Sequence, residues 1–255
     1  GEAAAVLHSL TEDGRGGAEV FSNLGNALVK LGDTGGADSA YDQALALGPN
    51  PGIRIKRALL LPVISASVAS MQVARFDFEQ RVDALIKEPP QLVDPFGEVG
   101  VPAFNLSYQE HNNRDLLAKL SDMYLAACPS LEFVAPHCSD SPLLDALTPL
   151  RIGFVSRFFQ SNSVGRCFHG VLRYPNRADV EVTAFTFAAG QDPLWKVIEG
   201  DVANTVILPA HLEAARQRIA EEALDVLVYT DIGMDPLTYY LAYSRLAPLQ
   251  CVLGG

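Results

Sequence analysis

Leu150-Arg-Ile-Gly-Phe-Val-Ser156 is the stretch at which the residue pattern of the chain changes. It is a short apolar run rich in β-forming residues, and four similar runs follow at residues 180–187, 204–208, 225–229 and 249–253. Helical patterns lie between them, at about residues 164–173, 193–200, 211–223 and 236–243. Alternation at this spacing indicates right-handed crossovers. We therefore predict an α/β fold, with a Rossmann-like parallel sheet covered by helices on both faces.

The loops after the strands are the places where such a sheet binds ligands. After the first strand, residues 156–166 are polar, carry two arginines and lead into a helix N-terminus, which favours an anion. This loop is neither a GxGxxG nor a GxxxxGK motif, so it indicates neither a dinucleotide nor a P-loop nucleotide. After the fourth strand, Asp235 before Pro236 is typical of a helix N-cap and first helical position. Asp231 has no such explanation and is a candidate for the ligand cleft.

Charge is distributed unevenly along the 255 residues. The chain has 19 Lys+Arg against 30 Asp+Glu, a formal net charge of −11, which disfavours general binding to nucleic acid. Residues 151–178 nevertheless contain no carboxylate and five arginines: Arg151, Arg157, Arg166, Arg173 and Arg177. Such a stretch is suited to one phosphorylated small molecule. The alternative is that these arginines are scattered and face water.

The first fifty residues carry a helical repeat pattern. Phe21, Leu24, Gly25, Leu28, Ala37, Tyr41, Ala44 and Pro49 follow the spacing of the tetratricopeptide repeat, which this segment resembles. We expect Leu24, Leu28 and Leu31 on one helix face, a close approach of two helices at Gly25 and Ala37, and a turn at residues 33–36. One repeat cannot bury its own face. We therefore expect residues 1–17 to be the degraded end of a preceding repeat, in a longer array.

We predict three segments: a repeat end at 1–52, a helical connector at 53–149, and a Rossmann-like half-domain at 150–255. Helical patterns in the connector cover 53–61, 70–86 and 114–127, residues 91–113 are irregular, and 136–149 read as a linker. His111 lies in a polar loop. It is either part of a site or a residue that is solvated or caps a helix. No apolar run approaches the roughly twenty residues of a membrane span, and no secretory leader is visible.

Four cysteines, Cys128, Cys138, Cys167 and Cys251, are too few for a disulfide framework in a chain of this length. Cys128, His137 and Cys138 lack the spacing of a zinc motif, so we expect buried free thiols and no metal. Free thiols indicate a reducing, cytoplasmic setting.

Three stretches of the last hundred residues, 150–159, 225–240 and 246–251, resemble the bacterial members of glycosyltransferase family 41, which includes the O-GlcNAc transferases and SPINDLY proteins. The likeness extends to the connector, at 105–108, 127–130 and 134–137. It implies inverting transfer of a sugar from a nucleotide sugar to a Ser/Thr hydroxyl of an acceptor protein, on a GT-B fold without a cofactor. UDP-GlcNAc is the default donor, although relatives use GDP-fucose and UDP-glucose. Oligomers through the repeats are also possible in this family.

The resemblance also implies site residues. The family histidine in the loop after the first strand corresponds to Asn162, which cannot accept a proton at neutral pH. The substrate diphosphate, water or a residue of a second domain would then take the proton. The second histidine position corresponds to Asp225, for which ending the preceding helix is the competing role. Asn162 and Asp231 are the candidate catalytic residues, and the candidate substrate-binding residues are Arg157, Gln160, Ser161, Gly165, Arg166, Gly254 and Gly255.

The resemblance places Gly254 and Gly255 at the start of a glycine-containing loop that leads into a second domain, so we expect this chain alone to be inactive. Two other hypotheses compete with the transferase. One is a non-catalytic binding or scaffold module that acts through its repeats, which the loss of the histidine favours. The other is a nucleotide-binding Rossmann protein of unrelated chemistry, which the missing glycine fingerprint disfavours.

Overall fold

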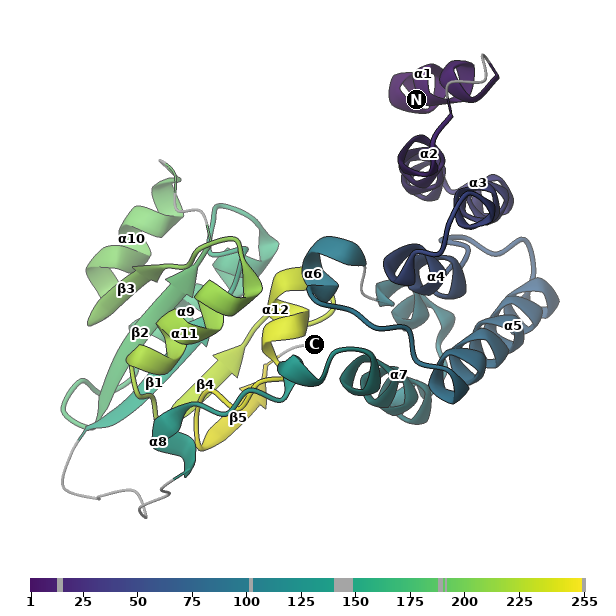
Figure 1. Ribbon diagram of the computed structural model, residues 1–255. Coiled ribbons are helices and arrows are strands. Elements are labelled where there is room, and N and C mark those ends of the chain that lie inside the picture. The colour runs from purple at the N-terminus through teal and green to yellow at the C-terminus, as the bar shows by residue number, and fades with distance from the viewer. Residues whose placement is uncertain (13–15, 101–102, 140–148, 188–189, 191, 254–255) are drawn as a thin grey trace. The chain divides into compact units, whose positions relative to one another are not determined.

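A computed structural model describes residues 1–12, 16–100, 103–139, 149–187, 190 and 192–253 (Figure 1). The chain forms two compact units, Gly1–Pro129 and Ser130–Gly255. The sequence had suggested boundaries at 52 and 149 instead. Residues 130–139 join the second unit because their backbone is bonded to it: Ser244 Oγ donates to the Leu131 carbonyl at 3.2 Å, and Val134 pairs with Arg245.

The first unit is helical. Its helices are α1 (Glu2–Glu12), α2 (Ala18–Leu31), α3 (Thr34–Ala46), α4 (Pro51–Ala58), α5 (Val68–Lys87), α6 (Pro95–Glu98) and α7 (Arg114–Ala127), with a 3-10 helix η1 (Phe104–Gln109). The segment expected to be irregular, 91–113, thus contains α6 and η1. In the described part of the chain, no helix has both the length and the apolar character needed to cross a membrane.

Helices α2 and α3 pack closely at Gly25, as the sequence predicts. A Cβ at Gly25 would lie 2.5 Å from the Tyr41 ring, and Ala37 is fully buried. The prediction that Leu31 shares the buried face is wrong, because Leu31 is 54% exposed. It occupies the last turn of α2, where Gly32 adopts φ 80° and ends the helix.

The expected turn at residues 33–36 is also shorter than predicted. Helix α3 begins at Thr34, and the Asp33 carboxylate accepts a hydrogen bond from the Gly36 backbone N–H at 2.8 Å. Asp33 therefore caps α3, and the chain reverses over Gly32 and Asp33 alone.

The second unit is built on a five-stranded parallel sheet. Its strands are β1 (Leu150–Val155), β2 (Val180–Thr186), β3 (Asn204–Ile207), β4 (Val226–Tyr229) and β5 (Leu249–Val252), in the order β3-β2-β1-β4-β5. The other elements are η2 (Pro129–Leu131), α8 (Pro136–Ser139), α9 (Ser163–Arg173), α10 (Pro193–Asp201), α11 (Leu212–Glu221) and α12 (Pro236–Leu241). All strand pairs are parallel, so the predicted α/β fold with a Rossmann-like parallel sheet is confirmed.

Helices cover both faces of this sheet. Helices α9 and α10 bury Phe168, Leu172 and Trp195 in one cluster with Phe154 of β1. Trp195, which is 1% exposed, also donates its ring N–H to Glu199 at 2.8 Å. Figure 1 shows α11 crossing the opposite face. Because side chains alternate along a strand, Phe154 and Val155 of β1 point to opposite faces of the sheet. Both are buried, so both faces are covered.

Candidate functional site

The candidate site lies at the carboxyl ends of β1 and β4, the two neighbouring strands where the strand order changes direction. The register pairs Val155 with Tyr229, so Ser156 and Arg157 follow β1 beside Thr230 and Asp231, which follow β4. Two candidate residues from distant parts of the sequence, Arg157 and Asp231, are thereby brought to one sheet edge.

Asp231 holds the turn that follows β1. One of its carboxylate oxygens, Oδ2, accepts hydrogen bonds from the Arg157 backbone N–H at 2.9 Å and from Ser156 Oγ at 3.1 Å. Its other oxygen, Oδ1, makes no hydrogen bond to any described residue, and the residue is 1% exposed. Burial raises the pKa of Asp231 to about 6, against the opposing effect of the Arg157 backbone N–H and of the Thr238 and Ser156 hydroxyls.

Two further buried hydroxyls lie at the same strand ends. Thr186 closes β2 and Thr230 follows β4, and within the described residues neither Oγ1 has a hydrogen-bond partner. Together with Asp231 Oδ1, three buried polar atoms at this edge retain hydrogen-bonding capacity. Neither threonine was among the candidates predicted from the sequence, although Thr230 stands directly after an apolar run.

Arg157 is anchored from two sides. Its Nε lies 3.4 Å from Asp235 Oδ2, and its guanidinium lies 6.0 Å from the centre of the Phe187 ring. Asp235 is almost fully buried and also caps α12, accepting from the backbone N–H groups of Leu237 and Thr238 at 2.9 and 3.1 Å. The predicted cap at Asp235-Pro236 is therefore confirmed. The Arg157 side chain remains 42% exposed, which leaves part of its charge accessible.

Asn162 is the N-cap of α9. Its side-chain oxygen accepts from the Gly165 backbone N–H at 3.0 Å, which stabilises the first turn of the helix. The sequence predicts Asn162 as a candidate catalytic residue and not as a cap, although asparagine is among the residues most favoured at a helix N-cap. Because this oxygen is held by the helix, the amide N–H groups of Asn162 are the side-chain donors that it can offer a substrate.

The rest of this loop is held in place by Asp192 and Gly165. Asp192 accepts from both Ser161 N and Ser161 Oγ at 3.0 Å while it caps α10. The Ser161 backbone hydrogen bond is the largest of the contacts that lower the pKa of Asp192. Gly165 packs against the carbonyl of Gln160, which lies only 2.1 Å from where a Cβ would stand. Ser161, Gln160 and Gly165 thus all shape the loop.

Three of the five arginines of the acid-free stretch pair with carboxylates from other parts of the second unit. These pairs are Arg151–Asp225 at 3.8 Å, Arg157–Asp235 at 3.4 Å and Arg173–Asp201 at 3.8 Å. Arg177 donates to the carbonyls at the end of α9, and Arg166 is exposed in that helix. The five arginines therefore do not form one positive cluster. Of the three in ion pairs, Arg157 is the one at the carboxyl ends of the strands.

Other sequence candidates lie elsewhere. Asp225 precedes β4, at the amino end of the sheet, where it accepts from the Arg151 backbone N–H at 2.8 Å. His111 is exposed between η1 and α7 of the first unit. Gly254 and Gly255 lie outside the described residues.

The thiol and imidazole groups considered for zinc do not assemble. Cys128 is buried in the first unit, whereas His137 and Cys138 belong to the second, with 3.5 Å between Cys138 Sγ and His137 Nε2. Across the described ranges, no three His, Cys, Asp or Glu side chains gather as a metal site would require. All four cysteines are free, but the prediction that they are buried is wrong for Cys167 and Cys251, which are exposed.

No protein-family model matches the chain, and no curated protein sequence matches it. Among solved structures, the chain is similar to a mutant of the O-GlcNAc transferase of Thermobaculum terrenum, with a TM-score of 0.55 and 17% sequence identity. The match covers 98% of this chain and 46% of that chain, so this chain spans about half the length of the structure it matches. At this identity, the likeness shows that the two proteins share a fold.

Proposed function

We propose that the chain is part of a protein O-glycosyltransferase, which transfers a sugar from a nucleotide sugar to Ser/Thr hydroxyls, by default GlcNAc from UDP-GlcNAc. The observation that carries this proposal is the extent of the fold likeness, 98% of the chain, which includes the helical first unit as well as the sheet. A generic Rossmann-like sheet would match only the second unit. The family-like stretches at 150–159 and 225–240 include the Ser156-Arg157 turn and the loop after β4, which carries Asp231.

Within this proposal, the strand-end edge presents the substrate with a fixed positive charge. Arg157, held by Asp235 and Phe187, faces the anionic donor, and the Asn162 amide stands at the N-terminus of α9 in the same loop. Such pre-positioned groups stabilise charge without reorganising during the reaction. Gln160, Ser161 and Gly165 keep the loop in shape.

Proton removal from the acceptor hydroxyl needs a base other than Asn162. A carboxyl with a pKa of about 6, such as Asp231, has the right acidity. However, Asp231 is buried and bonded to the turn it supports, so we assign it a positioning role. The donor diphosphate, water or a residue from another part of the protein then takes the proton. The four free cysteines agree with action in the reducing cytoplasm.

The test uses the protein expressed from its complete gene. Labelled UDP-GlcNAc, UDP-glucose and GDP-fucose are each incubated with it and a library of Ser/Thr peptides. We expect label to move to peptide from UDP-GlcNAc. If none of the three donors yields labelled peptide, the proposed activity is wrong.

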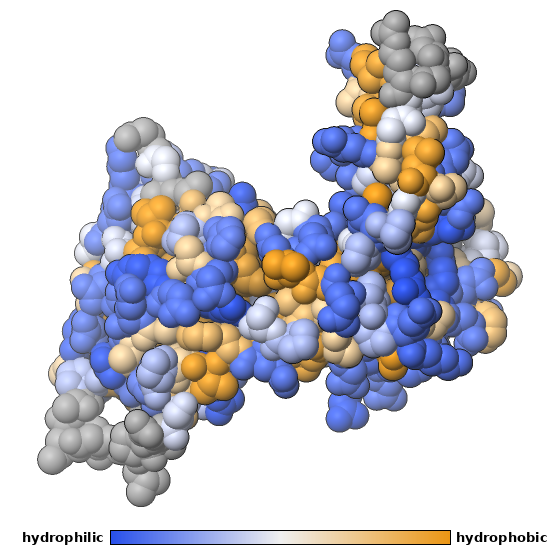
Figure 2. All heavy atoms as spheres, in the orientation of Figure 1, coloured by the Kyte–Doolittle hydropathy of each residue, from blue (hydrophilic) through white to orange (hydrophobic). Residues whose placement is uncertain are grey.

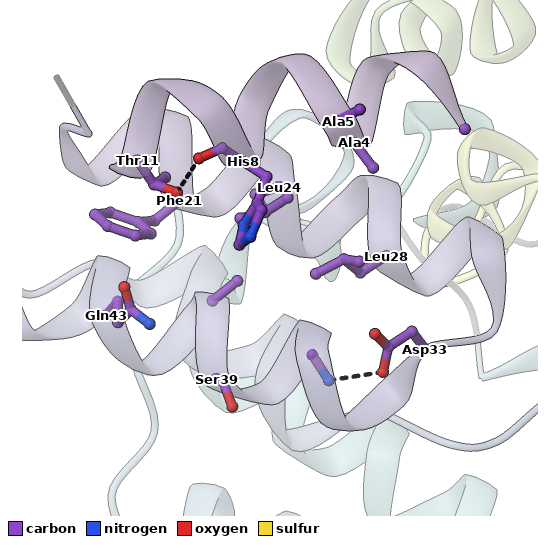
Figure 3. A pocket seen from close by; sticks show the side chains of 13 residues that line it. Ala4, Ala5, His8, Thr11, Phe21, Leu24, Leu28, Asp33, Ser39 and Gln43 are labelled. Atoms are coloured by element: carbon purple, nitrogen blue, oxygen red, sulfur yellow. Dashed lines mark hydrogen bonds between the residues drawn. The ribbon is translucent and has the colours of Figure 1, made fainter. Parts of the chain in front are cut away.

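A specific hollow favours the second candidate function, a binding module. It has a volume of about 700 Å³ and lies among α1, α2 and α3, with an apolar wall that includes Ala4, Leu24 and Leu28 (Figure 3). His8, Ser39 and Gln43 supply polar groups to the same hollow. Figure 2 shows further apolar side chains on the surface at this helical end. Such a surface is suited to binding a segment of a partner protein, whether or not the protein is also an enzyme.

Variants of Asn162 separate catalysis from capping. Serine and aspartate are also good N-caps, so Asn162→Ser and Asn162→Asp should keep the stability of the protein, whereas Asn162→Ala should lose about 1 kcal/mol. If the Asn162 amide contacts substrate, Asn162→Ser should nevertheless slow transfer about tenfold, which corresponds to about 1.4 kcal/mol. The measurement is kcat/KM beside urea denaturation. Transfer at the wild-type rate by both cap-preserving variants would leave Asn162 a purely structural role.

A further inference from the structure

A second hollow in the first unit has the features of a small-ligand site. Its volume is about 410 Å³, within the range of about 300–1,000 Å³ that is common for such sites. It is lined by residues of α2 and α3, by Lys56 of α4, by residues 59–61 directly after α4, and by Val99, Gly100, Ala103 and Asn105. It lies outside the strand-end site and is independent of the function proposed above.

The wall of this hollow is apolar and well packed. Leu59, Leu60 and Leu61 follow one another directly after α4, and all three are buried, as is Val99, which directly follows α6. Leu60 also belongs to the cluster that holds α3 against α4. A ligand that buries an apolar group here gains about 25 cal/mol for each Å² removed from water.

Lys56 brings a positive charge to this apolar wall. Its side chain is half-buried, and burial lowers its pKa with no carboxylate acting in the opposite direction. The next residue, Arg57, pairs with both Asp38 and Asp42, whereas in the described part of the chain neither Lys56 nor Lys30, which also lines the hollow, has an acidic partner. A partly desolvated ammonium without a counter-ion is unfavourable, and a bound anion would relieve it.

Hydrogen-bond donors lie beside the charge. The Tyr41 hydroxyl donates to the Asn26 side-chain oxygen at 2.8 Å, so the Asn26 amide group is left with N–H donors. Burial raises the pKa of Tyr41 to about 12, which keeps this hydroxyl protonated and the Asn26 orientation fixed. Asn105 adds a second side-chain amide.

We propose that this hollow binds a small organic carboxylate, with the carboxylate group paired to Lys56 and hydrogen-bonded by Asn26, and with a compact apolar body against Leu59–Leu61 and Val99. Of the two lysines that line the hollow, Lys30 is exposed and hydrated, so the half-buried Lys56 supplies one partly desolvated charge, which suits a monoanion. The leucine wall selects against compact inorganic anions, which have no apolar part. A neutral apolar ligand would leave the ammonium without a counter-ion.

The first experiment is isothermal titration calorimetry of the full 255-residue chain with octanoate as the probe. We expect saturable binding at one site and an affinity at least tenfold weaker for octanamide, which has the same apolar body without the charge. Lys56→Met should weaken octanoate binding at least tenfold. Lys87→Met, an exposed lysine on α5, is the matched control and should bind octanoate as the wild type does. Absence of saturable binding, or equal affinity for octanoate and octanamide, would overturn the proposal.

A second measurement does not depend on the folding of a variant. Wild-type protein is treated with limiting acetic anhydride, and acetylation of each lysine is followed by mass spectrometry with and without octanoate. We expect octanoate to protect Lys56 and to leave Lys87 unchanged. Equal acetylation of Lys56 in the presence and absence of octanoate would contradict the proposed pairing.

Discussion

Replacing Gly165 by alanine is expected to destabilise the second unit by about 3 kcal/mol. A Cβ at this position would stand 2.1 Å from the Gln160 carbonyl oxygen and 2.8 Å from the Gln160 backbone nitrogen. Both are backbone atoms of the loop that precedes α9, so no side chain can rotate to make room. The loop must shift, and the Asn162 cap is then lost with it. Chemical denaturation followed by circular dichroism measures the change.

Gly200 provides the matched control for this substitution. It also lies in a helix of the second unit, α10, but a Cβ there would meet no atom within 4 Å. Alanine is a better helix former than glycine, so Gly200→Ala should stabilise the protein by about 0.5 kcal/mol. The two identical chemical changes should therefore act in opposite directions. A Gly165→Ala protein as stable as wild type would show that the loop does not require this close approach.

The second large effect concerns Asp231 and pH. Because burial raises the pKa of Asp231 from 3.8 to about 6, the folded protein holds this proton more tightly than the unfolded chain does. Asp231 therefore contributes most stability below about pH 4, and the contribution is lost as the pH rises to about 6. A shift of about two units corresponds to about 3 kcal/mol.

Asp231→Asn removes this titration while its side-chain oxygen still accepts from Ser156 and Arg157. The free energy of unfolding of the variant, minus that of the wild type, should therefore increase by about 3 kcal/mol between pH 4 and pH 7.5. Denaturation curves across this range give the difference. A difference that stays constant with pH would mean that Asp231 titrates normally.

Asp192→Asn is the control with the opposite sign. Hydrogen bonds, first from the Ser161 backbone, lower the pKa of Asp192, so its ionised form stabilises the fold above the unfolded-state pKa. That contribution is lost as the pH falls through the folded-state value. The variant should be less stable than the wild type at neutral pH, and the gap should close under acid conditions.

The sheet could be predicted because each of its elements is encoded locally. The apolar runs at 150–156 and 180–187 are bounded by turns and separated by helical spacing, and the strands form within one or two residues of those limits. Helix N-termini can be predicted for the same reason. In Asp235-Pro236, the side chain that accepts the capping hydrogen bonds and the proline whose φ is fixed for a helix are adjacent in sequence. The same signature at Asp192-Pro193 marks α10.

The site could be predicted only in part, because its interactions join distant residues. The strand-end rule led to Arg157 and Asp231, but their connection through the Ser156 turn joins residues that are 74 or 75 positions apart in the sequence. Nothing local distinguishes Ser161 as a partner of Asp192, or Gly165 as the residue that admits the Gln160 carbonyl. The exposure of Leu31 likewise depends on where α2 ends, which the heptad-like spacing does not specify.

The burial of Trp195 has a practical consequence for all these measurements. It is the only tryptophan among the 255 residues, and it lies in the core between α10 and the sheet, so its fluorescence reports on the second unit alone. The regular secondary structure described in the first unit is helical, so far-ultraviolet ellipticity reports strongly on it as well. Recording both signals during one denaturation would reveal whether the two units melt together or one after the other.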